Sequence, residues 1–413
     1  MVAVQMFVAF ASAYFFSALV RAITAILSPT LVRELQLNAA DLGLLSGSLF
    51  LGFALMQLPL GKWLDRYGPR QVQLALLAVA GVGCLVFSQA QSFASLFVAR
   101  VLTGVGVSAC LMAALTSYRR WLPGDLQLRM NSWMLMAASS GLIASTLPVQ
   151  WLIPLVGWRP LFIWLALLVL ICMLLISRWV PANWEVKVPA ASAGAAPPPG
   201  LATIWAHPYF RRMAPLGLFN YGGLLAIQTL WAGPWMNKVT GLSTQESAQG
   251  LFWVNVWMLL TYLAWGSLNP RLSRMGIKAN QLVTWGVPLS LLCLGWMCVA
   301  GPAVPWWMWV VFLMLNTCVS NVPPAVGMAF PTEMAGRALT TFNLLIFSGV
   351  FIVQWGMGLL IEWFRRIGFE DVQAYQWSFS IFGICCLGAY LNFLWMGRRS
   401  ASLVQDKDPP KAA

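Results

Sequence analysis

The chain has 413 residues, of which 60% are hydrophobic and only 9% are charged, and its mean hydropathy is +0.74. Soluble domains carry about 25% charged residues, so this composition excludes a soluble globular protein and indicates an integral membrane protein. The long apolar runs lack the alternation typical of a membrane β-barrel, which leaves membrane-spanning helices. Because each span needs about 20 apolar residues, the length accommodates roughly a dozen of them.

The net charge of +13 does not indicate a nucleic-acid partner, because the basic residues lie in loops rather than on one amphipathic face. Most of them fall on one predicted side of the membrane. The opposite side holds only five: Arg33, Arg159, Lys238, Arg365 and Arg366. The positive-inside rule then places both termini in the cytoplasm, and we expect the protein in the inner (plasma) membrane of a bacterium.

The first half of the chain contains six predicted spans. Pro29 is expected to end the first of them, followed by an external loop. The spans cover approximately these residues: 6–27, 42–60, 72–90, a fourth from about 95, 130–152 and 161–176.

A segment rich in Ala, Pro, Gly and Ser separates this half from six further spans. Those spans are predicted at the following residues: 210–231, 251–268, 282–300, 306–328, 339–364 and 377–396. We therefore predict four units: an N-terminal six-helix bundle (1–180), a cytoplasmic linker (181–207), a C-terminal six-helix bundle (208–397) and a cytoplasmic tail (398–413).

Catalytic and metal sites are not expected. The eight cysteines lie inside apolar segments without metal-ligand spacing, and the only histidine, His207, lies in the linker. The sequence also lacks a nucleophile paired with a base and a phosphate-binding loop. We predict no cofactor, no metal and no enzymatic activity.

The stretch from Gly61 to Arg70 is charged and rich in turn residues, and it lies between two apolar segments. We interpret it as a tight turn on the membrane surface. Its residues Gly61, Asp65, Arg66, Gly68 and Arg70 match every specified position of G-x-x-x-D-R-x-G-x-R, so the stretch resembles the signature loop of the major facilitator superfamily. That resemblance implies a role in gating, with Asp65 as a conformational latch; a static brace of the turn is the alternative.

Residues 273–278 echo residues 65–70 in the second half, with serine in place of the carboxylate. Six spans, a linker and six further spans then extend the resemblance over the whole chain. It implies an all-α membrane protein with twelve transmembrane helices in two pseudo-symmetric bundles, and a substrate site near the midplane between them. Arg100, Gly104 and Gly106 resemble the family motif R-x-x-x-G-x-G of span 4, which implies helix packing or coupling.

Arg21 is the main candidate for substrate binding. A charge at the membrane centre costs about 2.5 to 3.5 kcal/mol on insertion scales, and Arg21 and Arg100 are the two arginines predicted at mid-membrane. Helical spacing places Arg21 on one face with Tyr14 and Ser17. A guanidinium flanked by hydroxyls can bind carboxylate or phosphate through two parallel hydrogen bonds. The alternative is that Arg21 reaches outward or bonds a neighbouring carbonyl.

The first span also resembles that of the organophosphate:phosphate antiporters, through Leu19-Val20-Arg21 and Pro29-x-Leu31. Those relatives use a second arginine on span 7, where this chain has Asn220. One arginine favours a carboxylate over a phosphate ester. Further candidate walls of the substrate cavity are Asn220, Gln228, Trp231 and Asn343, although amides in a bundle often only join helices.

Together these features predict a secondary transporter that moves a small organic anion by alternating access. All twelve acidic residues lie in predicted loops or near span ends, which favours anion exchange or symport in which the substrate itself carries part of the proton. The expected partners are the anionic solute, the lipid bilayer and a co-transported proton or counter-anion, and we expect a monomer. The alternatives are a multidrug or metabolite efflux pump of the same superfamily and a receptor that binds a solute without moving it.

Overall fold

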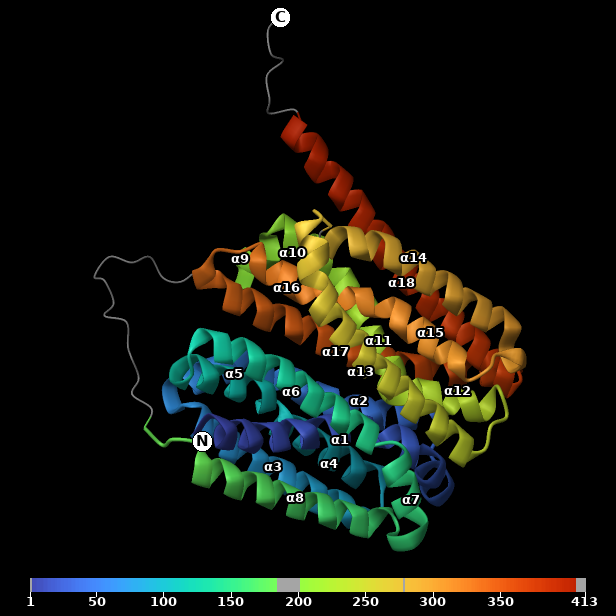
Figure 1. The fold of residues 1–413 in the computed structure, drawn as a ribbon. Coiled ribbons are helices and arrows are strands. Elements are labelled where there is room, and N and C mark those ends of the chain that lie inside the picture. Colours follow the sequence, from blue (N-terminus) through green and yellow to red (C-terminus); the bar gives the residue numbers. More distant parts are fainter. Residues whose placement is uncertain (1, 184–200, 278, 406–413) are drawn as a thin grey trace, which may run out of the picture.

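A computed structural model describes residues 2–183, 201–277 and 279–405. Every regular element in these ranges is helical. The helices form two bundles, the first from the N-terminal half and the second from the C-terminal half (Figure 1). We call the end where α2 runs into α3 and where α8 ends the linker end, and the end where α1 runs into α2 the far end. Figure 1 shows the bundles apart at the linker end and together toward the far end.

The first bundle contains eight helices: α1 (Val2–Leu35), α2 (Ala39–Tyr67), α3 (Pro69–Ser88), α4 (Phe93–Val107), α5 (Cys110–Trp121), α6 (Gly124–Ala144), α7 (Leu147–Val156) and α8 (Trp158–Trp179).

The second bundle is more irregular because π-helical and 3₁₀ turns (η) interrupt it. Its elements follow in chain order: α9 (Leu201–Ala206), α10 (Pro208–Pro215), η1 (Leu216–Tyr221), α11 (Gly222–Ala226), η2 (Ile227–Trp231), α12 (Ala232–Lys238), α13 (Thr244–Arg274), α14 (Ala279–Ala300), η3 (Gly301–Ala303), α15 (Trp307–Asn316), η4 (Thr317–Asn321), α16 (Val322–Met328), α17 (Thr332–Arg366) and α18 (Asp371–Gln405).

Ten of the described helical segments are long and apolar enough to cross a membrane, and the bent pair α6 and α7 makes an eleventh. The unbroken run from α10 to α12 covers the remaining predicted span. The protein is therefore an integral membrane protein, and the structure is consistent with the predicted twelve spans.

Helix α1 does not end before Pro29 as predicted, but continues to Leu35. Proline has no N–H for the carbonyl of Ala25, four residues earlier. The Ser28 hydroxyl donates to this carbonyl instead, at 2.8 Å. The hydrogen-bonding group lost at Pro29 is thus replaced inside the same helix, which a helix in lipid requires.

The turn between α2 and α3 is shorter than the ten residues predicted. Helix α2 runs on to Tyr67 and α3 begins at Pro69, so Gly68 alone reverses the chain, with φ of 79°. Only glycine adopts this conformation easily. Gly276 makes the equivalent turn with φ of 80° before α14, which matches the sequence echo between the two halves.

Two predicted boundaries also shift. The predicted linker includes the short helix α9, in which Ile204 is fully buried and Trp205 packs edge-on against Phe210. Helix α18 runs on through Gln405, into the predicted tail. Linker residues 184–200 and tail residues 406–413 lie outside the described residues.

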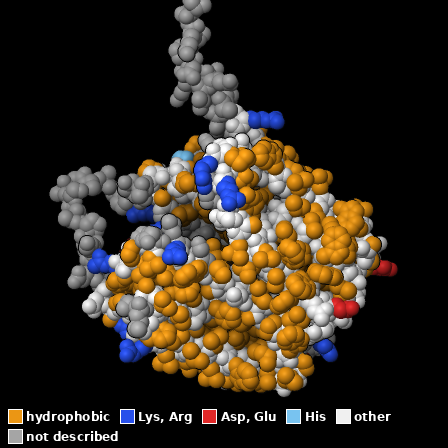
Figure 2. Space-filling view, in the orientation of Figure 1, with side chains coloured by type: hydrophobic (Ala, Val, Ile, Leu, Met, Phe, Trp, Pro, Cys, Tyr) orange, Lys and Arg blue, Asp and Glu red, His pale blue; other side chains and the backbone are white. Residues whose placement is uncertain are grey.

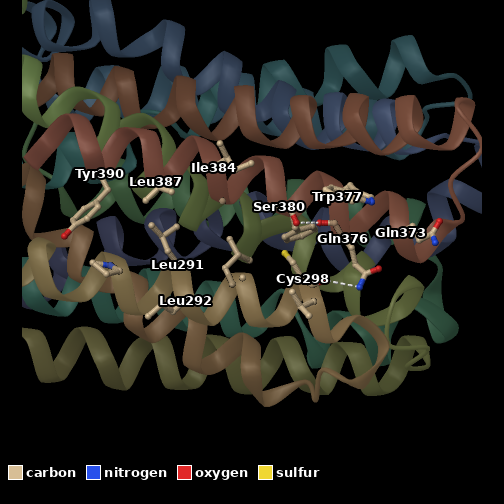
Figure 3. Close-up of a pocket in the computed structure, with 16 residues that line it drawn as sticks. Leu291, Leu292, Cys298, Gln373, Gln376, Trp377, Ser380, Ile384, Leu387 and Tyr390 are labelled. Carbon is tan, nitrogen blue, oxygen red and sulfur yellow. Dashed lines mark hydrogen bonds between the residues drawn. The ribbon is translucent and has the colours of Figure 1, made fainter. Parts of the chain in front are cut away.

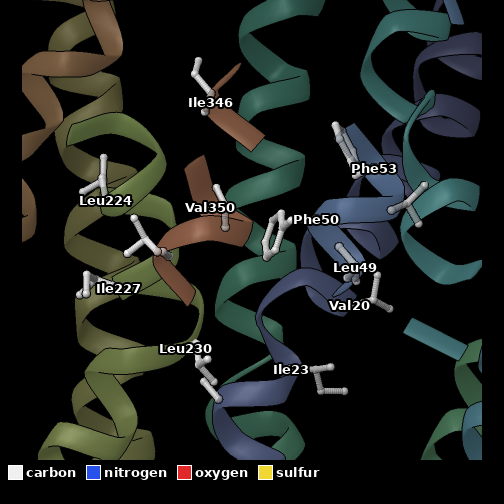
Figure 4. Close-up of a cluster of buried hydrophobic side chains, with 14 of the residues drawn as sticks. Val20, Ile23, Leu49, Phe50, Phe53, Leu224, Ile227, Leu230, Ile346 and Val350 are labelled. Atoms are coloured by element: carbon white, nitrogen blue, oxygen red, sulfur yellow. The ribbon is translucent and has the colours of Figure 1, made fainter. Parts of the chain in front are cut away.

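The bundles pack against each other mainly through α2 and α17. Buried side chains from α1 and α2 face those from α11, η2 and α17 across this interface, among them Phe50, Val350 and Leu230 (Figure 4). Phe347 of α17 packs against Phe53 with ring centroids 4.2 Å apart. This apolar contact fixes the position of the two bundles relative to each other, and with it the side chains between them.

The outer surface matches a bilayer. Figure 2 shows hydrophobic side chains over most of one face, with Lys and Arg gathered mainly toward the linker end. Exposed tryptophans such as Trp307 and Trp363 lie near helix ends, where amphipathic rings prefer the headgroup level.

Candidate functional site

Arg21 lies midway along α1 with a half-buried side chain. Its Nε donates to the backbone carbonyl of Ser17 at 3.2 Å, and its Cζ lies 5.7 Å from the centre of the Tyr14 ring. The two terminal nitrogens make no hydrogen bond to any residue that the structure describes. The predicted face of Arg21 and Tyr14 is therefore present, and the outer edge of the guanidinium is free to bind a ligand.

No carboxylate within the described ranges forms an ion pair with Arg21, so its charge is not neutralised by the protein. Two tyrosines of the second bundle lie nearby instead. Tyr221 of η1 lies within electrostatic range of Arg21 and Tyr14, and Tyr262 of α13 lies within the same range of Tyr221 and Tyr14. All four side chains are half-buried. They form a cluster, which we call the Arg21 cluster, with one cation and three phenol rings drawn from both bundles.

The sequence analysis did not identify Tyr221 or Tyr262. Tyrosine is scarce in this chain, with eight copies against 23 tryptophans, and a hydroxyl in a predicted span was the available signal. The sequence alone does not show which spans of the two bundles lie next to each other, so it could not place these tyrosines near Arg21.

Ser17 contributes its carbonyl to Arg21 rather than its hydroxyl. The Ser17 Oγ is buried and has no hydrogen-bond partner in the described structure. The Ser28 hydroxyl, by contrast, donates to a backbone carbonyl of the same helix. Of these two hydroxyls on α1, only that of Ser17 lacks a hydrogen-bond partner among the described residues.

Arg100 differs from Arg21 because it is completely buried. Its Nη1 donates to the carbonyl of Val20 at 2.8 Å and its Nη2 donates to the hydroxyl of Thr24. Arg100 thus joins α4 to α1 on either side of Arg21. Gly104 and Gly106 let α4 approach closely, because a Cβ at Gly104 would clash with the Leu49 carbonyl and one at Gly106 with Ala80. These contacts are those of a packing motif.

Asn220, Gln228 and Trp231 are buried in the second bundle. Gln228 donates to Asn255 Oδ1 at 2.9 Å, and the Trp231 indole donates to the Gln354 carbonyl at 3.1 Å. The Asn220 carbonyl accepts a hydrogen bond from Asn316 at 3.5 Å, and Asn220 Oδ1 is left unpaired. In this conformation Gln228 and Trp231 join helices, which is the alternative considered above for buried polar groups.

Asn343 is placed differently. It is half-buried on α17 at the linker side of Phe347, and it makes no hydrogen bond to described residues. Of the four candidates in the second half, it is the one with an accessible amide.

Asn220 and Trp231 are not connected by a regular α-helix. The π-helical turns η1 and η2 lie between them, and each adds residues to a turn, so a regular α-helix does not relate their directions. Such turns are frequent at functional sites. Here η2 packs against α1, and the Trp231 side chain is fully buried.

The far end is closed by tight contacts between α2 and α17. Cβ atoms added at Gly43 and Gly358 would clash with the carbonyls of Gln354 and Ala39, respectively. The Glu362 carboxylate of α17 accepts from the Ala39 amide at 2.8 Å, at the first residue of α2. A carboxylate at a helix N-terminus is favourable, so Glu362 fastens the two bundles together there.

The linker end of the same helix pair is open. The far-end contacts join Ala39 to Gly358 and Gly43 to Gln354, an antiparallel register that pairs Gly61 with Gly336 further along. Both of these glycines are exposed, and a Cβ added to either meets nothing within 4 Å.

Arg70 of the signature stretch joins α3 to α8 at this end. Arg70 Nη2 donates to the Ser177 carbonyl in the last turn of α8 at 2.6 Å, where a cation suits the helix dipole. The Arg66 guanidinium lies 5.3 Å from the centre of the Tyr67 ring. The role of Asp65 as a latch stays a prediction.

A separate pocket lies in an apolar groove of about 900 Å³ between α14 and α18. Figure 3 shows Gln376 bonded to the Cys298 carbonyl at one end and Leu291 and Leu387 along the wall. The groove contains none of the predicted site residues. It lies on the outside of the second bundle, where Leu292 and Ile384 are strongly exposed and face the lipid.

Several transporters resemble this chain in sequence. The 4-hydroxybenzoate transporter PcaK of Acinetobacter baylyi is 25% identical over 162 residues, which cover 39% of this chain and 35% of that protein. The 3-(3-hydroxy-phenyl)propionate transporter of Escherichia coli is 27% identical over 274 residues, 62% of this chain and 60% of that protein. The chain thus matches about a third to three fifths of the length of these relatives.

The fold is that of solved transporters. A bacterial homolog of the human lysosomal transporter Spinster, in an inward-facing unoccupied conformation, superposes with a TM-score of 0.74 at 16% identity, covering 99% of both chains. A D-xylose-proton symporter gives a TM-score of 0.72 at 14% identity, covering 94% of this chain and 96% of that one. The model of the Major Facilitator Superfamily matches residues 10–353, and the chain therefore belongs to this family of transporters.

Proposed function

We propose that this protein is a secondary transporter of a small aromatic carboxylate. Arg21 binds the carboxylate, and Tyr14, Tyr221 and Tyr262 pack around the ring and offer hydroxyls to its polar substituents. The observation that carries the proposal is the Arg21 guanidinium itself, which lies between the bundles without a neutralising carboxylate from the described residues.

The chemistry of the cluster suits this substrate class. An arginine and a carboxylate can form two parallel charge-assisted hydrogen bonds, which are roughly twice as strong as neutral ones. Tyrosines combine an apolar ring with a polar hydroxyl, as a hydroxylated aromatic acid also does. The relatives named for 4-hydroxybenzoate and 3-(3-hydroxy-phenyl)propionate transport support the same class.

Charge balance also limits how transport is coupled. When the empty transporter changes conformation to reset its binding site, the charge of Arg21 has no counter-ion inside the membrane, and this is costly. A counter-anion that occupies Arg21 on the return removes this cost. Entry of the acid together with a proton is the other route, because the carboxylates of the described spans, such as Glu362, lie near helix ends and not beside Arg21.

The substrate site would open to each side of the membrane in turn, as α2 and α17 pack closely at one end and separate at the other. In the present conformation the far end is zipped, with Glu362 on the Ala39 amide. Closure of the linker end continues the same register and brings Gly61 against Gly336, where two hydrogens in place of side chains permit close approach. This gives the signature glycine Gly61 its gating role.

Uptake of labelled 4-hydroxybenzoate into proteoliposomes tests the proposal. We expect saturable accumulation by the wild-type protein. Arg21→Gln should lower kcat/KM about 10- to 150-fold, because a hydrogen bond to a charged group contributes about 1.5 to 3 kcal/mol. Arg211→Gln, a change of an exposed arginine, is the matched control and should leave uptake unchanged.

Three results would contradict the proposal. Unchanged transport by Arg21→Gln would favour an efflux pump for apolar compounds. Saturable binding without accumulation would favour a receptor. Failure of the wild-type protein to bind any of a panel of aromatic carboxylates would remove the substrate class.

A further inference from the structure

A second cavity of about 520 Å³ lies at the far end, between the two bundles. Its wall includes residues of α1, the start of α2, α12, the end of α17 and the start of α18. Ala39 and Leu42 form part of it, so it lies directly outside the zipped contact of α2 with α17. The Arg21 cluster lies further along α1, about 18 Å from Arg33 at 1.5 Å per residue.

Three cations line this cavity: Arg33, Lys238 and Arg365. They are three of the five basic residues that the sequence places on this side of the membrane. Arg365 is neutralised, because its Nη1 bonds Glu362 at 2.7 Å and its Nε bonds Asp371 at 2.9 Å. Arg33 and Lys238 are exposed and form no ion pair or hydrogen bond through their side chains with the described residues.

Three other carboxylates near this end have partners of their own. Glu34 accepts from Trp158 and Arg159 on the outside of the first bundle. Asp41 accepts from the Asn38 amide, and Glu246 accepts from Ser243. The positive charges of Arg33 and Lys238 therefore act on the cavity, and Tyr375 lines it as well.

We propose that this cavity is an entry site for the anionic solute, at which Arg33 and Lys238 hold a carboxylate before the far end opens. The inference rests on the proposed function, and it adds a second anion site outside the closed gate. A cleft lined by charge of one sign raises the local concentration of oppositely charged ligands. When α2 and α17 separate, the anion passes from this pair of cations to Arg21 along α1.

A helix-dipole role is the competing explanation, because Arg33 lies in the last turn of α1 and Lys238 in the last turn of α12. Such a role affects helix stability but not ligand binding. A test must therefore measure the anion at the cavity directly and without depending on transport.

The test places a cysteine at Val32, which lines the cavity, in the full chain. Two methanethiosulfonate reagents, one carrying a sulfonate and one a trimethylammonium group, then report the local potential, with the unsubstituted chain as background. We expect the anionic reagent to be favoured, and Arg33→Gln with Lys238→Gln to lower the ratio of the two rates about tenfold or more. Gln91→Cys, in the exposed turn before α4, is the control and should show no such change.

Protection by 4-hydroxybenzoate completes the test. We expect this anion to slow modification of Val32→Cys in the parent and not in the chain that also carries Arg33→Gln and Lys238→Gln. Protection that persists without both cations, or no protection in the parent, overturns the entry site. Because labelling needs no turnover, Arg21→Gln should retain this protection even though it loses transport, which separates failure of this site from failure of the proposed function.

Discussion

Arg21 and Arg100 lie on neighbouring helices at similar depth, yet their partners give them different roles. Both terminal nitrogens of Arg100 are used, by the Val20 carbonyl and the Thr24 hydroxyl. Arg21 uses only its Nε, on the Ser17 carbonyl. Arg100 therefore has neither terminal nitrogen left for a ligand, whereas Arg21 retains the two nitrogens that match a carboxylate.

This difference predicts the effect of removing an Arg100 partner. Thr24→Val should lower the free energy of unfolding by about 1 to 3 kcal/mol, because Nη2 of a fully buried guanidinium loses its acceptor. The KM for the anion should stay within about twofold, since Thr24 braces α1 without touching the cluster. Thermal unfolding in detergent and uptake kinetics measure the two effects, and a large change in KM with unchanged stability would contradict the assignment.

At the residue scale, the sequence predicted what a single helix determines. The shared face of Tyr14 and Arg21 follows from helical spacing, and the structure confirms it. Tyr221 and Tyr262 join the cluster only through packing between bundles, which no local pattern contains. Trp231 ends a π-helical turn, so regular helical spacing does not give the direction of its side chain, whose indole donates to the Gln354 carbonyl.

Helices α2 and α17 act as one element whose two ends differ in this conformation. At the far end, glycines are in contact with the opposing backbone, and at the linker end Gly61 and Gly336 face open space. The two ends of this helix pair therefore form the two gates. A methyl group placed at either end should oppose closure of that end alone.

A matched pair of alanine substitutions tests this. Gly43→Ala should disfavour the present conformation, because its methyl meets the Gln354 carbonyl, whereas Gly61→Ala should disfavour closure of the linker end. Overpacking costs about 1 to 3 kcal/mol, enough to shift the ratio of the two states severalfold or more.

Spin labels on Lys62 and Arg211, exposed residues of opposite bundles, can follow the linker end. Distances between the labels should shorten in Gly43→Ala and lengthen in Gly61→Ala relative to the parent. Shifts in the same direction would show that the two ends do not oppose each other.

At the element scale, the sequence predicted the helices whose position follows from apolar composition. It did not predict where a helix continues because a side chain replaces a missing backbone hydrogen bond. The apolar runs gave the spans, and glycine at positions 68 and 276 gave the two equivalent turns. Pro29 did not end α1, because the Ser28 hydroxyl supplies the hydrogen bond that proline lacks. The signature turn was predicted to take ten residues, but Gly68 alone forms it. Gly61 does not end α2, because glycine is tolerated within an exposed helix.

For the whole molecule, the distribution of charge predicts orientation. The linker end carries most of the basic residues, so it should face the cytoplasm. A membrane-impermeant thiol reagent added to intact cells should label Gln91→Cys and not Lys62→Cys, with the unsubstituted chain as background. The reverse pattern would place the linker end outside and exchange the two gates.

The sequence predicted the two bundles and their connection, and the family relationship confirms the fold class. It could not predict which end is open, because one sequence must stabilise both arrangements of a transporter. That choice depends on small differences in packing, such as Glu362 on the Ala39 amide, between states that contain the same helices.

The central claim is that Arg21 recognises the negative charge of the solute, and a comparison of 4-hydroxybenzoate with its uncharged amide tests it most directly. Binding to the purified protein, measured by calorimetry, should favour the acid about 10-fold or more in the wild type, because only the acid forms charge-assisted hydrogen bonds with the guanidinium. In Arg21→Gln this preference should disappear while the weak affinity for the amide remains. Equal preference for the acid in both proteins would contradict the account.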